Sequence, residues 1–319
     1  MNNTWGIMFS GQGAQKAQMG LDCYRSDQDF KETIDAASEV LKMSLPEILQ
    51  NDQGQLAQTK YVQPSLVAVS LGFYRMLQRD LPQLTIGAMV GLSLGEYSAL
   101  IASRKLDFKT GMQLLKKRAE AMQTDSEQNA SAMEAIMDPQ IEKVNQLCKQ
   151  LTVDGKQVSI ANYNSPNQIV IGGTIKAVQE AADTIMQKKL ASKTINLKVS
   201  GAFHTPLYQH TETVLKQALE DVKFHITSIP VMSNTTGKPF ELDDLASILA
   251  QQVVCPTHFQ ACFEKMVADY HVDAVVEIGA GRTLSKLAKT INPNVSRAKI
   301  TNYKSYQKFL KKADETHGT

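Results

Sequence analysis

The order of strand-like and helix-like segments in this sequence predicts an α/β protein with a mostly parallel sheet and one inserted, smaller subdomain. Three observations lead to this prediction. Short apolar strands followed by turns and helices fill residues 1–126, a different order fills 127–198, and the first order returns in 199–319. With 319 residues, 43% of them hydrophobic, the chain is long enough to bury a substantial core.

Two apolar strands, each followed by a glycine-containing turn, form the first part of the predicted core. Residues 5–9 form a short strand that leads into the loop SGQGAQ at 10–15, and residues 86–90 form a second strand. Helices are expected at 30–41, 63–77, 96–103 and 109–122. A strand, a turn and a helix in succession are typical of a largely parallel sheet.

The middle of the chain has the order β-α-β-β-α-β, which is typical of a ferredoxin-like unit. The six segments are expected at 132–136, 139–150, 158–162, 168–171, 175–188 and 194–199. Pro139 suits the first turn of a helix, and the turn NSPN at 164–167 separates the two central strands. We therefore place an inserted subdomain at 127–198, between core segments 1–126 and 199–319.

The last third of the chain returns to the order of the core. Strands are expected at 231–234 and 274–278, and helices at 242–252 and 283–290. The second of these strands is followed by the turn GAG at 279–281. The tail beyond Lys311 is expected to fray.

The composition argues against several classes of function. The formal net charge is only +2, and the short basic clusters lack the interleaved aromatic residues of a nucleic-acid site. No apolar run approaches the ~18 residues that span a membrane, and the N-terminus lacks the basic region of a signal peptide. The four scattered cysteines have no metal-ligand spacing, so we expect reduced thiols, no metal site and a cytoplasmic protein.

The segment GLSLG at 91–95 predicts a nucleophilic serine. It fits the pattern Gly-x-Ser-x-Gly and stands between an apolar strand and a helix, which is the context of a nucleophile elbow. The alternative is a plain strand-to-helix turn with a capping Ser93. The backbone of the loop at 10–15 is a candidate second half of an oxyanion hole. A dinucleotide site is disfavoured there, because Lys16 stands where a third glycine is needed.

Two further side chains are candidates for the same site. On a helical wheel Arg118 falls on the apolar stripe, where it is either a structural ion pair, a side chain that reaches the surface, or a clamp for a substrate carboxylate. Among the six histidines we favour His204, which lies in a loop between a strand and a helix, with His258 second.

Several motifs, spread over nearly the whole chain, together resemble malonyl-CoA:acyl carrier protein transacylases. In chain order they are GQGAQ at 11–15, GLSLGEYSAL at 91–100, Arg118, ANYNSP at 161–166, GAFH at 201–204 and EIGAG at 277–281. The resemblance implies an α/β-hydrolase-like core with a ferredoxin-like insert. It also implies that Ser93 is the nucleophile, that His204 is its general base, and that Arg118 holds the free carboxylate of a malonyl group.

The resemblance extends to residues around these three. It implies that the backbone N–H groups of Gln12 and Leu94 form the oxyanion hole, and that Asn162 lines the substrate site. Phe203 would limit the room for an α-methyl branch on the substrate. Gln252 matches the position whose backbone carbonyl orients the histidine in place of a triad acid.

This chain departs from the family pattern at four places. Leu92 replaces a usual histidine directly before the nucleophile, and Ala280 replaces a usual proline. Phe259, in THF at 257–259, differs from the commoner Val-x-Trp, and Glu134 stands where a small residue is more usual. These departures concern rate and fine specificity, because none of them removes a catalytic role.

The resemblance implies ping-pong transfer of malonyl from malonyl-CoA to the phosphopantetheine thiol of acyl carrier protein, in support of fatty acid biosynthesis. No cofactor is needed, because coenzyme A enters as a thioester and the partner carries the phosphopantetheine. The alternatives are a discrete acyltransferase of a polyketide pathway, a serine esterase or thioesterase, and a non-catalytic carrier-docking protein. A monomer is expected, with Lys188 and Lys189 as candidates for docking an acidic carrier.

Overall fold

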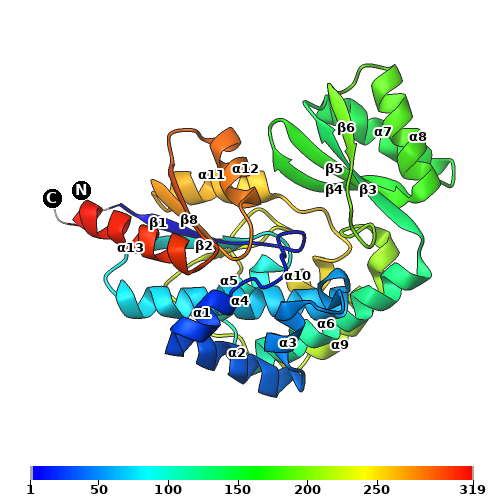
Figure 1. The fold of residues 1–319 in the computed structure, drawn as a ribbon. Coiled ribbons are helices and arrows are strands. Elements are labelled where there is room, and N and C mark those ends of the chain that lie inside the picture. The colour runs from blue at the N-terminus through cyan, green and yellow to red at the C-terminus, as the bar shows by residue number, and fades with distance from the viewer. Residues whose placement is uncertain (1–2, 318–319) are drawn as a thin grey trace.

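The computed structural model describes residues 3–317, with side chains up to Ala313, and contains two β-sheets of different type (Figure 1). The strand order is β7-β2-β1-β8-β9 in the larger sheet and β4-β5-β3-β6 in the smaller one. All neighbouring strands of the larger sheet run parallel, whereas those of the smaller sheet run antiparallel. The protein is therefore an α/β protein with a mostly parallel sheet and a second, antiparallel one.

The five parallel strands form the centre of the larger part of the molecule. They are β1 (Trp5–Phe9), β2 (Ile86–Gly91), β7 (Val231–Met232), β8 (Ala274–Ile278) and β9 (Ser296–Ile300). Every residue of β1 and β8 is buried, which explains their nearly continuous apolar sequences. The parallel register brings the C-terminal ends of β1, β2 and β8 to one edge, which is where sheets of this type place their ligands.

Helices cover both faces of the parallel sheet (Figure 1). On one side lie α4 (Thr59–Asp80) and α2 (Gln28–Leu41), and on the other α11 (Phe259–Asp269) and α12 (Thr283–Ile291). The other elements of this part are α1 (Leu21–Ser26), α3 (Leu45–Gln50), η1 (Gln55–Ala57), α5 (Gly95–Ala102), η2 (Pro206–Tyr208), α9 (Gln209–Leu219), α10 (Leu245–Gln251) and α13 (Tyr303–His317). None of the helices within residues 3–317 is long and apolar enough to cross a membrane.

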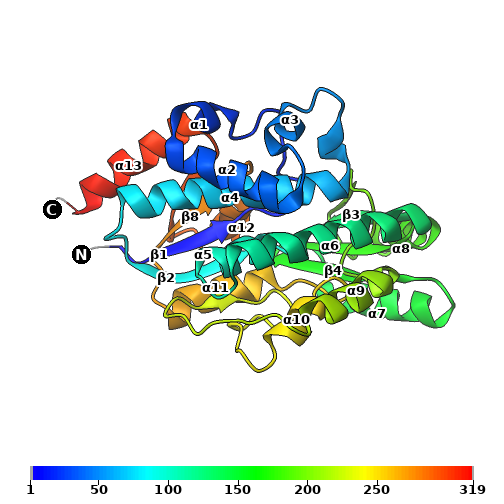
Figure 2. The ribbon, with the colours of Figure 1, turned by 90° about the horizontal axis from the view of Figure 1, so that it is seen from below.

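The long helix α6 (Phe108–Gln128) leads from the core to the antiparallel sheet (Figure 2). The elements that follow it are β3 (Ser131–Met137), α7 (Ile141–Val153), β4 (Val158–Ser165), β5 (Gln168–Thr174), α8 (Ile175–Gln187) and β6 (Lys193–Asn196). One face of this sheet packs on α7 and α8, and residues of its other face, among them Met133 and Val170, join the core of the larger part.

Several elements differ from their predicted extents. Helix α6 continues six residues beyond the predicted end at 122, because its polar last turns pack on the core: Asp125 is buried and accepts from the backbone N–H of Thr211. The strand predicted at 231–234 has only two residues. The tail beyond Lys311 remains helical to His317 and does not fray there. Residues 318–319 lie outside the described part.

The elements of the last third that have no counterpart in the prediction include β9, α11 and α13. The sequence of β9, SRAKI, contains only two apolar residues, because it is an edge strand that is only partly buried. Helix α11 buries Phe259, Phe263 and Met266 against the parallel sheet. The helix was not predicted because its apolar residues repeat over only a few positions and because it directly follows the irregular segment at 252–258.

Candidate active site

Ser93 occupies a strained turn between β2 and α5. Its φ angle is +52°, a left-handed conformation that is unfavourable for a residue with a side chain. The glycines on either side are required by space: a Cβ on Gly91 would lie 1.8 Å from the backbone of Gly95, and one on Gly95 would lie 2.2 Å from the carbonyl oxygen of Phe9. The backbone N–H of Ser93 donates to Asn234 Oδ1 at 2.7 Å. This geometry is that of a nucleophile elbow rather than of a capping serine.

Two backbone N–H groups beside Ser93 remain free of acceptors. Within residues 3–317, neither the N–H of Leu94 nor that of Gln12 donates a hydrogen bond. The loop that carries Gln12 lies against the elbow, since a Cβ on Gly11 would come within 2.5 Å of the Leu92 carbonyl oxygen. Two unpaired N–H groups at such a site are what an oxyanion hole requires.

A cavity of about 160 Å³ joins the candidate residues. The residues predicted from the sequence that line it are Gln12, Ser93, Leu94, Arg118, Asn162, Phe203 and His204. The antiparallel sheet contributes Met133 and Val170 to the opposite wall. The cavity therefore lies between the two sheets, at the carboxyl edge of the parallel one.

The guanidinium of Arg118 lies in the wall of this cavity. Its Nη2 donates to Ser93 Oγ at 3.1 Å and its Nη1 to Gln63 Oε1 at 2.7 Å. The side chain is 1% exposed, so it does not reach the surface, and it takes part in none of the ion pairs within the described chain. Burial lowers the pKa of Arg118, and its Nε–H has no partner among the described residues. A buried cation without a carboxylate partner favours the binding of an anion.

His204 is 4% exposed and also has a left-handed backbone, with φ at +63°. Its Nδ1 lies 2.7 Å from the backbone carbonyl oxygen of Gln252. Because a carbonyl only accepts, we assign the proton to Nδ1, which leaves Nε2 with a free lone pair. Burial lowers the pKa of His204 to about 4, with a further lowering from Arg118 and an opposing effect of the Gln252 carbonyl. The imidazole is thus neutral near pH 7, which is the form a general base needs.

Ser93 and His204 line the same cavity but do not hydrogen-bond to each other within the described chain. The Ser93 hydroxyl oxygen instead accepts from Arg118. A guanidinium that contacts this hydroxyl is well placed to bind the acid group of a substrate that reacts at Ser93.

The remaining predicted residues shape the cavity. Asn162, on β4, donates from Nδ2 to Thr257 Oγ1 at 2.7 Å and so links the antiparallel sheet to the core. Phe203 is buried against Tyr208, with ring centroids 5.3 Å apart. Gln252 does not line the cavity: it is buried behind Ser93 and His204.

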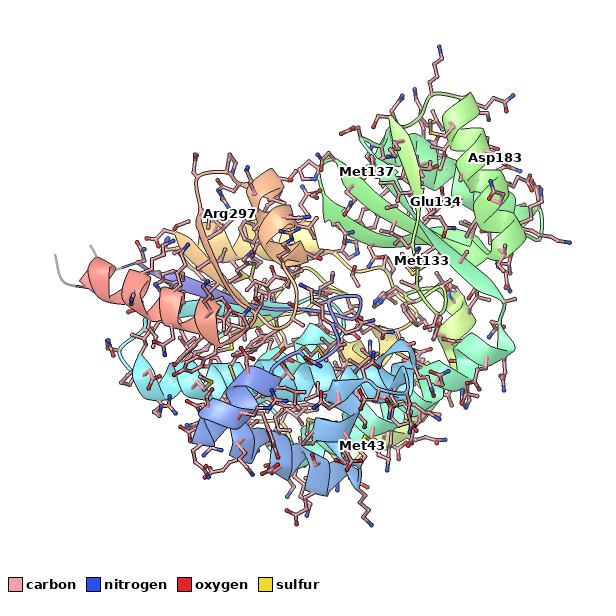
Figure 3. All side chains as sticks on the ribbon, in the orientation of Figure 1. Met43, Met133, Glu134, Met137, Asp183 and Arg297 are labelled. Carbon is pink, nitrogen blue, oxygen red and sulfur yellow. The ribbon has the colours of Figure 1, made fainter. Side chains whose placement is uncertain are left out.

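Of the four departures from the family pattern, only Leu92 lines the cavity. Phe259 and Ala280 are buried away from it. Glu134 follows Met133 on β3 (Figure 3). Successive side chains on a strand point to opposite faces of the sheet. Glu134 therefore lies on the face that α7 and α8 cover, whereas Met133 faces the cavity.

Three buried polar residues of the site were not identified from the sequence. Gln63 contacts Arg118 and Gln12, Asn234 holds the Ser93 backbone, and Glu96 accepts from the backbone N–H of Asn234. The signal available for Gln63 is a polar residue inside the apolar stretch of α4. No group of metal-ligating side chains occurs among the described residues.

Comparison with known proteins defines the class of this protein. The acyl transferase domain family matches residues 7–313, which is nearly the whole chain. The chain therefore belongs to the acyl transferase family and is an acyltransferase.

More specific similarities point to one branch of that family. The chain is 32% identical to the malonyl CoA-acyl carrier protein transacylase of Bacillus subtilis over 298 residues, or 93% of each chain. It is 36% identical to the crystal structure of MCAT from Streptococcus pneumoniae, with a TM-score of 0.92 over 97% of this chain and 100% of that one. A malonyl-transacylase solved in complex with its type II polyketide acyl-carrier protein has 30% identity and a TM-score of 0.90, over 97% and 99% of the two chains.

Proposed function

We propose that this protein transfers the malonyl group from malonyl-CoA to the phosphopantetheine thiol of acyl carrier protein, through an ester on Ser93. The observation that carries the proposal is the buried guanidinium of Arg118, which has no carboxylate partner in the described chain and lies 3.1 Å from Ser93 Oγ. A cation in this position suits an acyl group that ends in a free carboxylate. The names of the relatives in Bacillus and Staphylococcus agree with this substrate.

In the first half of the proposed reaction, Ser93 Oγ attacks the thioester carbonyl of malonyl-CoA while His204 Nε2 takes its proton. The N–H groups of Gln12 and Leu94 stabilise the oxyanion. The carbon–sulfur bond then breaks, and coenzyme A leaves with the proton that His204 returns. The malonyl carboxylate stays bound to Arg118. At Nη2 it takes the place of the serine oxygen, so a charged acceptor replaces a neutral one.

In the second half, His204 takes the proton of the carrier thiol, and the sulfur attacks the malonyl-serine ester. Collapse of the intermediate releases malonyl-carrier and returns the proton to Ser93. The partners are malonyl-CoA and acyl carrier protein, and no cofactor takes part. The exposed Lys188 and Lys189 are proposed to attract an acidic carrier; a transfer rate unchanged by Lys→Glu at both positions at low salt contradicts this.

We further propose that residues 127–198 form a ferredoxin-like subdomain within an α/β-hydrolase-like core made of 1–126 and 199–319. The order β3-α7-β4-β5-α8-β6 supports the first assignment. The elbow between β2 and α5 supports the second. The free state of the cysteines among the described residues fits the proposed cytoplasmic location, and we propose a monomer.

The pathway has two candidates, fatty acid biosynthesis and a polyketide pathway. The similarity to a malonyl-transacylase complexed with a type II polyketide carrier protein keeps the second candidate open, because the same site serves both. Transfer rates with carrier proteins of the two pathways, measured side by side, distinguish them.

The test of the proposed function is the fate of the malonyl group. Incubation with malonyl-CoA and phosphopantetheine-bearing acyl carrier protein is expected to give malonyl-carrier, observed by intact-mass spectrometry, in proportion to the coenzyme A released. Carrier protein without phosphopantetheine is the control. Release of free malonate with an unmodified carrier would instead identify an esterase or thioesterase.

A further inference from the structure

The side-chain amide of Gln252 connects the nucleophile to Arg118. Its Oε1 accepts from Arg118 Nη2 at 3.0 Å, and its Nε2 donates to the backbone carbonyl of Ser93 at 3.0 Å. The same Nε2 donates its second hydrogen to Glu96 Oε2. These contacts are separate from the backbone carbonyl of Gln252, which binds His204.

The chemistry of the acceptors fixes the direction of this amide. A backbone carbonyl and a carboxylate accept hydrogen bonds and donate none, so both partners of Nε2 require an NH₂ group there. The amide oxygen must then face Arg118, which only donates. Without Glu96, one of the two groups that hold this orientation is lost.

Glu96 is itself held from two sides. It lies in the first turn of α5, is completely buried, and accepts from the backbone N–H of Asn234 through Oε1 and from Gln252 through Oε2. Burial raises the pKa of Glu96 to about 8, while the bonds from Asn234 and Gln252 and the charge of Arg118 oppose the shift. Each oxygen faces an N–H donor, so the network fits the ionised form of Glu96, which prevails above this pKa.

We propose that Glu96 is a positioning residue for substrate specificity: through the Gln252 amide, it holds the Arg118 guanidinium in the orientation that selects a malonyl group. The inference rests on the proposed function and adds a residue that does not touch the cavity. The second anchor of Arg118 is Gln63, which binds Nη1 on the other side.

The substitution Glu96→Gln tests the direction of the amide. Glutamine has one side-chain oxygen, which cannot serve the N–H groups of both Asn234 and Gln252. When its NH₂ group faces Gln252, the Gln252 amide turns over and presents a donor to the Arg118 N–H group. Two opposed donors in a buried site displace the guanidinium.

The experiment measures single-turnover acylation of Ser93 by malonyl-CoA and by acetyl-CoA, at about pH 8.5, above the pKa of Glu96. The variants are Glu96→Gln, Arg118→Ala and the double variant. We expect Glu96→Gln to lower the malonyl-to-acetyl rate ratio about tenfold or more, mostly through slower malonylation. In the Arg118→Ala background, Glu96→Gln should leave the ratio unchanged, because its effect passes through Arg118.

Glu277→Gln is the matched control. Glu277 is another completely buried carboxylate, at the end of β8, and it binds Ser10 and Ser285 but not Gln252. We expect this change to affect both acyl donors by the same factor. If Glu96→Gln does not fold, Gln252→Met tests the same inference. This change removes the side-chain amide and keeps the backbone carbonyl that binds His204.

The outcomes separate this inference from the proposed function. A malonyl-to-acetyl ratio retained in Glu96→Gln and in Gln252→Met overturns the positioning role, as does an equal loss with both acyl donors. A further fall of the ratio when Glu96→Gln is added to Arg118→Ala also overturns it. A wild-type protein that forms no malonyl ester contradicts the proposed function itself.

Discussion

The two walls of the cavity differ in chemistry. The wall from the parallel sheet is polar and strained: Ser93 and His204 have left-handed backbones, and Arg118 is a buried cation. The wall from the antiparallel sheet presents the apolar Met133 and Val170 and the neutral amides of Asn162 and Asn164, with no ionisable group among the described residues that line it. We infer from this difference that the reacting groups belong to the core, whereas the smaller sheet gives the cavity its shape. Substitutions in the two walls should therefore affect different steps.

The largest effect in the polar wall is expected from His204→Ala. The change removes the group proposed to take the serine proton, so the acylation rate should fall by about 10²- to 10⁴-fold. Stopped-flow release of coenzyme A measures this step. The thermal unfolding temperature serves as the control for folding, and an acylation rate near that of the wild type would remove His204 from the mechanism.

Arg118→Ala should have the next largest effect, and a selective one. Malonylation should fall by about 10- to 100-fold while acetylation changes little, because only the malonyl group ends in a carboxylate. Competition between malonyl-CoA and acetyl-CoA, read by intact mass, gives the ratio directly. Equal losses for the two acyl donors would indicate a structural role for this arginine.

The third prediction concerns how the stability of the wild type and of His204→Ala depends on pH. The pKa of His204 is about 4 in the folded protein, below the ordinary value of 6.5, so the folded state resists protonation. The contribution of the neutral imidazole to the free energy of unfolding is fully present above about pH 6.5. It is lost as the pH falls toward 4, and the free energy of unfolding decreases by about 3 kcal/mol. Denaturant unfolding between these limits should show this loss in the wild type and not in His204→Ala. Acylation should correspondingly stay constant from about pH 7 to 5.

The smallest effect is expected at Val170, an apolar residue of the wall from the antiparallel sheet. Val170→Ala enlarges the cavity without removing a polar group, so both acyl donors should change by a similar, small factor, through KM more than kcat. A strong loss of malonyl preference in this variant would contradict the division of roles between the two walls.

The parts of the site that could be predicted from the sequence are those encoded locally. The elbow around Ser93 has its glycines two residues on either side, and the wheel position of Arg118 follows from one helix. The roles of Gln12, Leu94, Asn162, Phe203 and Gln252 came from family resemblance. The structure brings Gln12, Leu94, Asn162 and Phe203 to one cavity, and their roles remain predictions.

The hydrogen-bond network behind Ser93 could not be predicted, because it joins residues far apart in the chain. Asn234 and Gln252 lie 141 and 159 residues from Ser93, and no local pattern links them to it. The fold shows the same limit: the buried strands β1 and β8 were recognised from their apolar sequences, whereas the partly buried edge strand β9 was not.

The most direct test of the account is the intact mass of the protein after brief mixing with malonyl-CoA alone. The wild type should gain the mass of one malonyl group, located at Ser93 by peptide mapping, and Ser93→Ala should gain none. A malonyl adduct that persists in Ser93→Ala, or a wild type that stays unmodified while coenzyme A is released, would contradict the covalent mechanism.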